Sequence, residues 1–159
     1  MIIRKTNLSD LDTVCSIYSD AQVFMQRSGN PDQWGNVHPP RDLIISDIEA
    51  GTSYVCECDG KIEAVFYFNI EVEPTYAEID GKWLNDEPYG VVHRIASARS
   101  GTGAGAFCLE WCFEQCGNLR IDTHCDNKPM LGLLEKLRFS YCGIIWVENG
   151  DERKAYQKV

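Results

Sequence analysis

Apolar residues recur every three to four positions in four stretches of the chain, which is the spacing of a buried helix face. The first stretch follows a short strand at residues 2–4, and Asn7 or Ser9 can cap its start. The others cover residues 43–50, residues 103–116 and the residues after Pro129. The pattern therefore predicts four helices, of which the third has only a narrow polar stripe and is mostly buried.

The remaining apolar runs are short and bounded by turn residues, which predicts strands. They cover residues 53–58, 61–70, 90–97, 119–124, 141–147 and 152–158. Asp59-Gly60 and Asn149-Gly150 predict hairpins, and Asp80-Gly81 predicts a further hairpin or a loop. The order is strand, two helices, three strands, helix, strand, helix and two strands. It predicts a mixed α+β fold, with antiparallel strands first and a locally parallel centre.

Composition and charge narrow the class of protein. Hydrophobic residues make up 44% and charged residues 25%, as in ordinary globular proteins, and no repeat or linker divides residues 1–159, so we expect one domain. A net charge of -9 argues against non-specific nucleic-acid binding and slightly favours cationic partners such as amines. No apolar run approaches the roughly 20 residues of a membrane span, and the start lacks an export-signal layout. We expect a cytoplasmic protein that binds neither membranes nor nucleic acid.

Eight cysteines raise the question of disulfides or zinc. Cys108, Cys112 and Cys116 recur on one side of a predicted helix, and Cys56 and Cys58 share a strand face. No Cys-x-x-Cys pair is present, and cysteines along one helix are a poor match for structural zinc. We therefore expect reduced thiols packed in the core and no metal site.

A glycine-rich loop runs from the fourth predicted strand, at residues 90–97, into the third predicted helix. Glycines at alternate positions allow positive φ and close approach of a ligand, and the first N–H groups of a helix have no internal partner. With the helix dipole, such a loop binds a pyrophosphate through its main chain. The loop consists of Ser100, Gly101, Thr102, Gly103, Ala104 and Gly105.

This loop resembles the signature of the GNAT superfamily of acyl-CoA N-acyltransferases, Gln/Arg-x-x-Gly-x-Gly/Ala between a strand and a long helix. Gly103 and Gly105 match both signature glycines, and Ser100 stands where the family has Gln or Arg. A second family motif, Asn followed by a helix ending in Gly-Phe, is similar to residues 127–139, with Arg138 in place of Gly. The resemblance implies a central mixed, mostly antiparallel sheet of about six to seven strands with helices on both faces.

The resemblance also implies a cofactor, acetyl-CoA or coenzyme A, in a cleft where two strands splay apart. Its pantetheine arm would pair with the main chain of Ile95, Ala96 and Ser97. Its pyrophosphate would meet the loop, and Asn127 would hydrogen-bond the cofactor from the start of the next helix. The loop residues assigned to this role are Ser100, Gly101, Thr102, Gly103, Ala104 and Gly105. The basic residues that can meet its phosphates are Arg99, Lys128, Lys136 and Arg138.

Acyl transfer needs a neutral amine, a polarised carbonyl and a leaving group that is protonated or stabilised. An N–H near Ile95 can polarise the carbonyl. His93, two residues earlier on the same strand, is the candidate base because histidine titrates near neutral pH, although it can equally be a structural histidine. The family often protonates the thiolate with a Tyr that corresponds here to Leu134. Tyr141, Cys125 or water can take that role.

The acceptor is expected to be a small-molecule amine or a peptide amine, bound between the first helical region and the segment before residue 90. Aromatic walls and two acids are predicted for this pocket. The aromatic and apolar residues are Phe24, Met25, Trp34, Trp83 and Tyr89, and the acids are Asp86 and Glu87. The family is often dimeric, so a homodimer is one expectation. The function predicted is N-acetyl transfer from acetyl-CoA to a primary amine by direct attack in a ternary complex.

Three other interpretations stay open at this stage. The chain can be a coenzyme A-binding module without chemistry, because the family's Tyr is missing. Gly101-x-Gly103-x-x-Ala106, with Asp122 beyond it, also fits a dinucleotide fingerprint, but only 53 residues follow Ala106. A nucleophilic Cys125 beside His124 is the third, although adjacent strand side chains are expected to diverge.

Overall fold

The computed structural model describes residues 1–159 and contains one eight-stranded sheet with strand order β1-β2-β3-β5-β6-β8-β7-β4. The strands are β1 (Ile2–Lys5), β2 (Ser53–Cys58), β3 (Lys61–Ile70), β4 (Asp80–Gly81), β5 (Gly90–Ser97), β6 (Leu119–Thr123), β7 (Ser140–Trp146) and β8 (Glu152–Lys158). The α-helices are α1 (Leu11–Arg27), α2 (Arg41–Glu49), α3 (Ala104–Cys116) and α4 (Lys128–Lys136). Two short 3-10 helices are η1 (Leu8–Asp10) and η2 (Pro74–Tyr76). Every strand pair is antiparallel except β5–β6.

The expected mixed α+β fold is confirmed, with one correction in the number of strands. The sheet has eight strands rather than six or seven, because Asp80 and Gly81 pair with Ile144 and Gly143 as a two-residue strand at the edge. Gly81 and Gly143 approach so closely that a Cβ on either would lie 2.1 Å from the other strand's main chain. Glycine at both positions is what allows this edge pairing.

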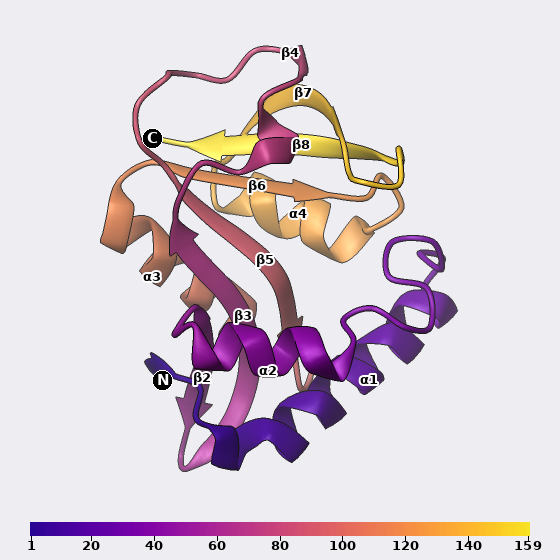
Figure 1. Ribbon diagram of the computed structural model, residues 1–159, viewed down its shortest axis with the longest axis vertical. Helices are drawn as coiled ribbons and strands as arrows, with labels where there is room; N and C mark the ends of the chain where they lie inside the picture. Colours follow the sequence, from indigo (N-terminus) through magenta and orange to yellow (C-terminus); the bar gives the residue numbers. More distant parts are fainter.

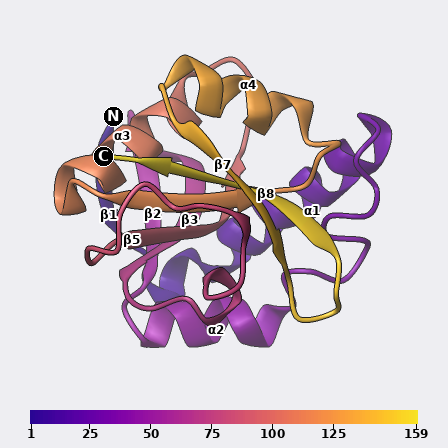
Figure 2. The same ribbon diagram turned by 90° about the horizontal axis from the view of Figure 1, so that it is seen from above.

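Helices cover both faces of the sheet, with α1 and α2 on one face and α3 and α4 on the other (Figures 1 and 2). Val14, Ile17 and Ile44 pack on the first face, against Val65 and other strand residues. On the second face, α3 and α4 bury a larger apolar cluster with β3, β5 and β6. A third cluster, around Tyr76, lies under the segment between β3 and β5.

Local signals set the ends of the two helices that border the site. Gly103, with φ 79°, is the N-cap of α3, and Gly117, with φ 65°, ends the same helix. At α4 the side chain of Asn127 accepts a hydrogen bond from the N–H of Met130 at 3.2 Å, and Pro129 stands in the first turn. The cap of α3 leaves N–H groups of its first turn free, whereas at α4 the N–H groups of Lys128 and Met130 already have acceptors in the protein.

The eight cysteines are all free, and Cys56, Cys108 and Cys112 are fully buried between α3 and the sheet. Burial raises the pKa of the Cys108 and Cys112 thiols well above its usual range, so both stay protonated. They act as small apolar residues of the core. None of the helices combines the length and the apolar character that a membrane span requires.

Candidate active site

The two central strands separate soon after they pair. β5 and β6 pair only through Gly90 with Leu119 and Val91 with Arg120, although β5 continues to Ser97 and β6 to Thr123. Figure 1 shows the two strands leaving in different directions from this short contact. The sheet therefore opens between β5 and β6, as the resemblance to the GNAT superfamily implies.

A β-bulge turns the main chain of β5 at the opening. The register of β3 and β5 shifts between Val65 and Tyr67, and Arg94 has φ 50°, which few non-glycine residues adopt. Asp47 of α2 holds this residue, because Arg94 Nε and Nη2 donate to Asp47 Oδ2 at 3.1 and 2.8 Å. The guanidinium also stacks over the Tyr67 ring at 4.8 Å. Burial raises the pKa of Asp47, and Arg94 opposes that rise.

The glycine loop follows β5 and presents main-chain donors at the start of α3. Gly101 and Gly103 both have positive φ, near 78° and 79°, and a Cβ added to either would meet nothing within 4 Å. The N–H groups of Gly103, Gly105 and Ala106 have no acceptor in the chain, whereas that of Ala104 donates to the Thr102 hydroxyl at 3.3 Å. Open space, free N–H groups and a helix N-terminus together suit an anion.

Asn127 and Arg99 already have partners within the protein. The Asn127 oxygen caps α4, and its amide nitrogen donates to Gln33 Oε1 at 3.0 Å, which ties α4 to the α1–α2 loop. Arg99, just after the end of β5, forms an ion pair with the buried carboxylate of Glu63 on β3. Asn127 nevertheless lines the large cleft described next, and Arg99 does not.

A cleft of about 890 Å³ lies between the α1–α2 loop, α2 and the face of the sheet. At its floor His93 Nε2 lies 3.0 Å from Glu73 Oε2. The other Glu73 oxygen accepts from the N–H and the hydroxyl of Thr75, at 3.1 and 2.9 Å. The hydrogen bond from His93, with those from Thr75, lowers the pKa of Glu73 to about 2. The pair joins a fixed carboxylate to an imidazole that is 23% exposed.

Further titratable groups surround His93 in the cleft. Tyr67 and Tyr76 pack against the imidazole, with ring centroids 5.6 and 6.3 Å away. A second histidine, His38, lies across the cleft against Trp34, and burial lowers its pKa to about 4. Glu71 and Asp122 add two half-buried carboxylates to the lining.

The structure brings some of the predicted site residues to the cleft and places others elsewhere. Those that line it are Met25, Trp34, His93, Ile95 and Asn127. Ala96 is buried towards α1, and Ser97 lies beside Gly105 at the end of β5. Phe24 is 50% exposed and outside the lining.

Trp83 and Tyr89 do not form a wall of the cleft, which corrects the predicted acceptor pocket. Their rings stack on the Arg120 guanidinium, at 4.3 and 3.9 Å. The aromatic side chains therefore hold a cation of the protein itself. Asp86 and Glu87 are exposed and also lie outside the cleft, so the acids that line the cleft come from other segments.

Tyr141 is also not brought to His93. It lies on β7, is 56% exposed and packs edge-on against Tyr156 of β8, at 5.5 Å between ring centroids. Both tyrosines border a separate groove beside α4. Leu134, at the position where the family often has Tyr, is fully buried in the core.

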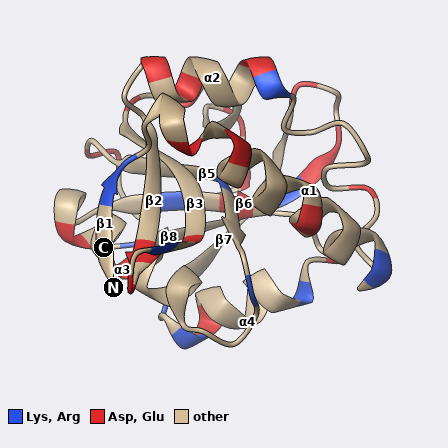
Figure 3. Ribbon diagram, turned by 90° about the horizontal axis from the view of Figure 1, so that it is seen from below, with Lys and Arg blue, Asp and Glu red and all other residues tan.

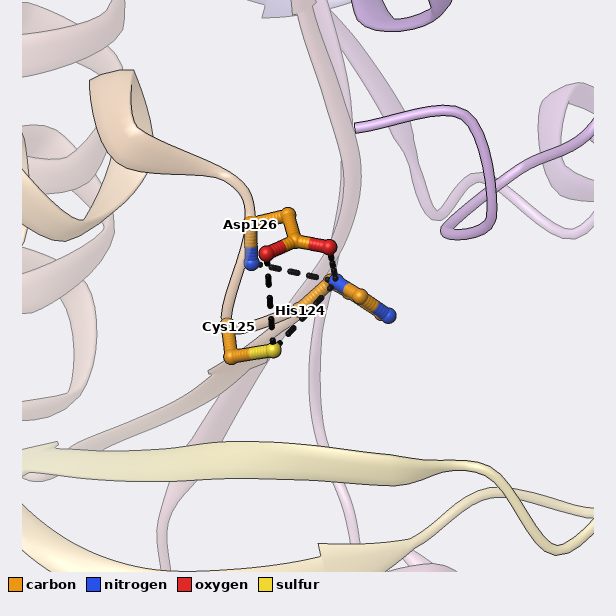
Figure 4. Close-up of side chains that lie close together, drawn as sticks. All are labelled: His124, Cys125 and Asp126. Atoms are coloured by element: carbon orange, nitrogen blue, oxygen red, sulfur yellow. Dashed lines mark hydrogen bonds and ion pairs between the residues drawn. The ribbon is translucent and has the colours of Figure 1, made fainter. Parts of the chain in front are cut away.

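The side chains of His124, Cys125 and Asp126 converge, contrary to the expectation that His124 and Cys125 diverge (Figure 4). β6 ends at Thr123, so strand alternation no longer applies to these residues. Cys125 Sγ lies 3.8 Å from His124 Nδ1, and the three donor atoms lie within 4.8 Å of one another. The N–H of Asp126 already donates to His124 Nδ1 at 3.1 Å, so this cluster closes the turn before α4.

Sequence reasoning missed the residues that define the floor of the cleft. They are Gln33, Asp47, Tyr67, Glu71, Glu73 and Asp122. Alternation along β3 places Tyr67 and Asn69 on one face, and continuing it leads to Glu71 and Glu73. This was the available signal, but it does not say which face borders a cleft.

Comparison with known proteins identifies the family. No family model matches the chain, and no curated protein matches it. Among solved structures, a GNAT-family acetyltransferase from Streptococcus agalactiae is 31% identical, with a TM-score of 0.89 over 99% of this chain and 94% of that one. A putative acetyltransferase from Staphylococcus aureus is 24% identical, with a TM-score of 0.73 over 99% and 98%. The chain therefore belongs to the GNAT family of acetyltransferases.

A third structure shares the fold alone. It is yncA, a putative acetyltransferase from Salmonella typhimurium solved with acetyl-CoA. It is 16% identical, with a TM-score of 0.66 over 98% of this chain and 91% of that one.

Proposed function

We propose that this protein transfers an acetyl group from acetyl-CoA to a primary amine, by direct attack in a ternary complex. The observation that carries the proposal is the His93–Glu73 pair at the floor of a cleft that begins where β5 and β6 separate. A base beside an opening in the sheet lets an acceptor and an acyl donor meet from different directions. Membership of an acetyltransferase family supports the same reaction.

The residues around the opening fit coenzyme A. The free N–H groups of Gly103, Gly105 and Ala106 suit its pyrophosphate. The hydroxyl of Thr123, at the end of β6, is buried and has no hydrogen-bond partner in the protein. It therefore offers a polar group of a bound ligand a hydrogen bond near the opening. Residues proposed to hold the cofactor are Ile95, Ala96, Ser97, Ser100, Gly101, Thr102, Gly103, Ala104, Gly105 and Asn127. Acetyl-CoA supplies an activated thioester when bound.

Proton transfer from the amine is assigned to His93. When Nε2–H donates to Glu73, the lone pair of Nδ1 is free to take a proton from the acceptor, directly or through water. Glu73 then stabilises the imidazolium that forms. This places the carboxylate in a positioning role and the imidazole in a catalytic one.

The two remaining roles are polarisation of the thioester carbonyl and departure of the thiolate, and we assign them to the main chain at the bulge and to solvent. An N–H near Ile95 polarises the thioester carbonyl, because the bulge at Arg94 turns β5 towards the opening. No side chain is assigned to protonate the thiolate, since Leu134 is buried and Tyr141 lies elsewhere. Because the pKa of a thiol is about 8.5, its thiolate can depart as a leaving group without protonation by a strong acid.

A coenzyme A-binding module without catalysis is the second candidate, and the fully buried Leu134 favours it. A panel of amines with acetyl-CoA, measured by release of free thiol and by mass of the product, separates the two. Calorimetry with coenzyme A runs in parallel. Thiol release that depends on an amine supports the enzyme, whereas binding without release on any acceptor supports the module. Absence of binding contradicts both.

A further inference from the structure

Two carboxylates stand on either side of His93, and each is held by a tyrosine hydroxyl. Tyr67 donates to Glu71 Oε1 at 2.6 Å, and Asn69 donates to the other oxygen at 2.9 Å. On the opposite side Tyr76 donates to Asp122 Oδ1 at 2.7 Å. Glu71 follows β3 and Asp122 lies on β6, the two strands that flank β5 in the sheet.

Neither carboxylate is in an ion pair. The other half-buried and buried carboxylates with side-chain hydrogen bonds do have a basic partner: Asp10 and Glu57 with Arg4, Asp47 with Arg94, Glu63 with Arg99, Glu73 with His93, and Asp126 with His124. Removing a carboxylate from water is costly unless its charge is compensated. Glu71 and Asp122 are half-buried in the cleft, yet only neutral groups donate to them.

The hydroxyl groups that hold these carboxylates keep their protons. Burial, together with the neighbouring carboxylate, raises the pKa of both Tyr67 and Tyr76 above the usual range. Each tyrosine therefore orients a carboxylate without neutralising it. Such a group is preorganised for a cation that comes from outside the protein.

The cations that line the cleft are already engaged. Arg94 donates to Asp47, and Arg153, 7% exposed, donates to the carbonyl oxygens of Glu152 and Gln33. Two exposed acids, Asp32 and Glu148, add negative charge to the lining. On the same side of the sheet, α2 carries acidic residues as well (Figure 3). The cleft thus has an excess of negative charge on both sides of His93.

We infer that the acceptor is an aliphatic diamine or polyamine, with ammonium groups received by Glu71 and Asp122 on the two sides of His93. This inference rests on the proposed acetyl transfer and names the substrate class for it. One nitrogen loses its proton to His93 and attacks, while a second stays protonated and is held by a carboxylate. An acceptor with a carboxylate in place of the second ammonium is disfavoured, because carboxylates outnumber guanidinium groups in the lining of the cleft.

Three acceptors of equal chain length test the inference: 1,5-diaminopentane, 1-aminopentane and 5-aminopentanoate. The far end of the chain carries an ammonium, a methyl group or a carboxylate, and because either amine of the diamine can react, its kcat/KM is divided by two before the comparison. With acetyl-CoA saturating, kcat/KM measured by thiol release is expected to be at least about tenfold higher for the diamine than for the monoamine, a difference of about 1.4 kcal/mol. The amino acid is expected to be the poorest acceptor.

Isosteric variants then assign the effect to the two carboxylates. Asp122→Asn keeps an oxygen that accepts from Tyr76, and Glu71→Gln keeps one that accepts from Tyr67, while each removes a charge. Both are expected to raise KM for the diamine at least severalfold, to change kcat little, and to leave the monoamine almost unaffected. Asp86→Asn, an exposed acid outside the cleft, is the matched control and should change neither acceptor.

The outcomes distinguish this inference from the proposed function. Equal kcat/KM for diamine and monoamine, or a preference for 5-aminopentanoate, overturns the diamine assignment while thiol release still supports acetyl transfer. No thiol release with any amine, despite native circular dichroism, overturns both. A loss that is equal for diamine and monoamine in Asp122→Asn and Glu71→Gln contradicts a role in holding the second ammonium.

Discussion

The two sides of the opening in the sheet are built in different ways. On one side the glycine loop offers the free main-chain N–H groups of Gly103, Gly105 and Ala106 at the start of α3. On the other side the cleft around His93 is built from side chains of α2, β3, β5, β6 and the segment between β3 and β5. One surface depends on main-chain geometry, the other on tertiary packing.

The difference shows which mutations each surface tolerates. Side chains in the loop can change, as Ser100 does relative to the family's Gln or Arg, provided that the glycines preserve the main-chain conformation. In the cleft a single substitution removes a charge or a hydrogen bond but leaves the main chain intact. The loop should therefore respond to backbone strain, and the cleft to isosteric changes of charge.

The largest expected effect is that of Gly103→Val. Gly103 has φ 79° as the N-cap of α3, a conformation that costs a β-branched residue about 2–3 kcal/mol or forces the loop to rearrange. Because the N–H groups then no longer converge, coenzyme A affinity measured by calorimetry should fall about 30- to 100-fold or vanish. Gly105→Val should lower the affinity less, because Gly105 does not have a positive φ and its Cβ would lie at a contact distance of 3.4 Å from the Leu133 side chain of α4.

Gly117→Val is the matched control for this strain. Gly117 has φ 65° at the other end of the same helix, and a Cβ there would meet nothing within 4 Å. The variant should lose a similar amount of stability in urea but keep its coenzyme A affinity. Micromolar binding by Gly103→Val would contradict the assignment of the loop.

The second largest effect is expected on turnover, when either member of the His93–Glu73 pair is changed. His93→Gln removes the proton acceptor and should lower kcat by about 100-fold or more, with coenzyme A affinity unchanged. Glu73→Gln keeps a group near the imidazole and should cause a smaller loss, together with a shifted pH profile of kcat. If His93→Gln retained the pH profile and rate of the unmodified protein, the imidazole would have no part in proton transfer.

The same contrast explains what the sequence could predict. The strands, the helices, the opening between β5 and β6 and the character of the glycine loop all follow from local patterns or from the family motif. The cleft followed only in part: residues such as Trp34 and His93 were predicted to line it, but the carboxylates around His93 were not, because they come from distant segments. Arg94 adds a second reason, since the bulge at its positive φ breaks the alternation that assigns side chains to a face.

Particular residues show where composition misleads. Trp83 and Tyr89 have the aromatic character of a ligand pocket, but the cation that they hold is Arg120 of the same chain. Cys125 was placed opposite His124 by strand alternation, and the turn after Thr123 brings the two together. Both errors arise because a residue type indicates the chemistry available and the fold decides which partner it finds.

A smaller effect is expected on the folding stability of the protein in acid, through Glu73 of the cleft. Folding lowers the pKa of Glu73 from 4.5 to about 2, so the native state binds fewer protons than the unfolded chain in this range. The stabilisation is complete above pH 4.5 and is lost as the pH falls towards 2. After allowance for solvent screening it amounts to about 1–2 kcal/mol.

Urea unfolding from pH 6 to pH 3 measures this contribution. The unmodified protein should lose stability more steeply below pH 4.5 than Glu73→Gln, whose amide does not titrate. Glu87→Gln, an exposed acid outside the cleft, should follow the unmodified protein. Parallel curves for Glu73→Gln and the unmodified protein would mean that the His93–Glu73 pair stabilises the folded state no more than a neutral hydrogen bond does.

The smallest effect is expected from Tyr141→Phe, which tests whether the region outside both surfaces takes part in the reaction. The Tyr141 ring is 56% exposed on β7, and its contact with Tyr156 does not need the hydroxyl. kcat measured by thiol release should therefore stay unchanged, whereas Tyr67→Phe, which removes the donor to Glu71, should raise KM for the amine. A clear loss of kcat in Tyr141→Phe would make this tyrosine the acid that protonates the thiolate. It would then require β7 to move towards the opening, because the groove beside α4 is separate from the cleft that holds His93.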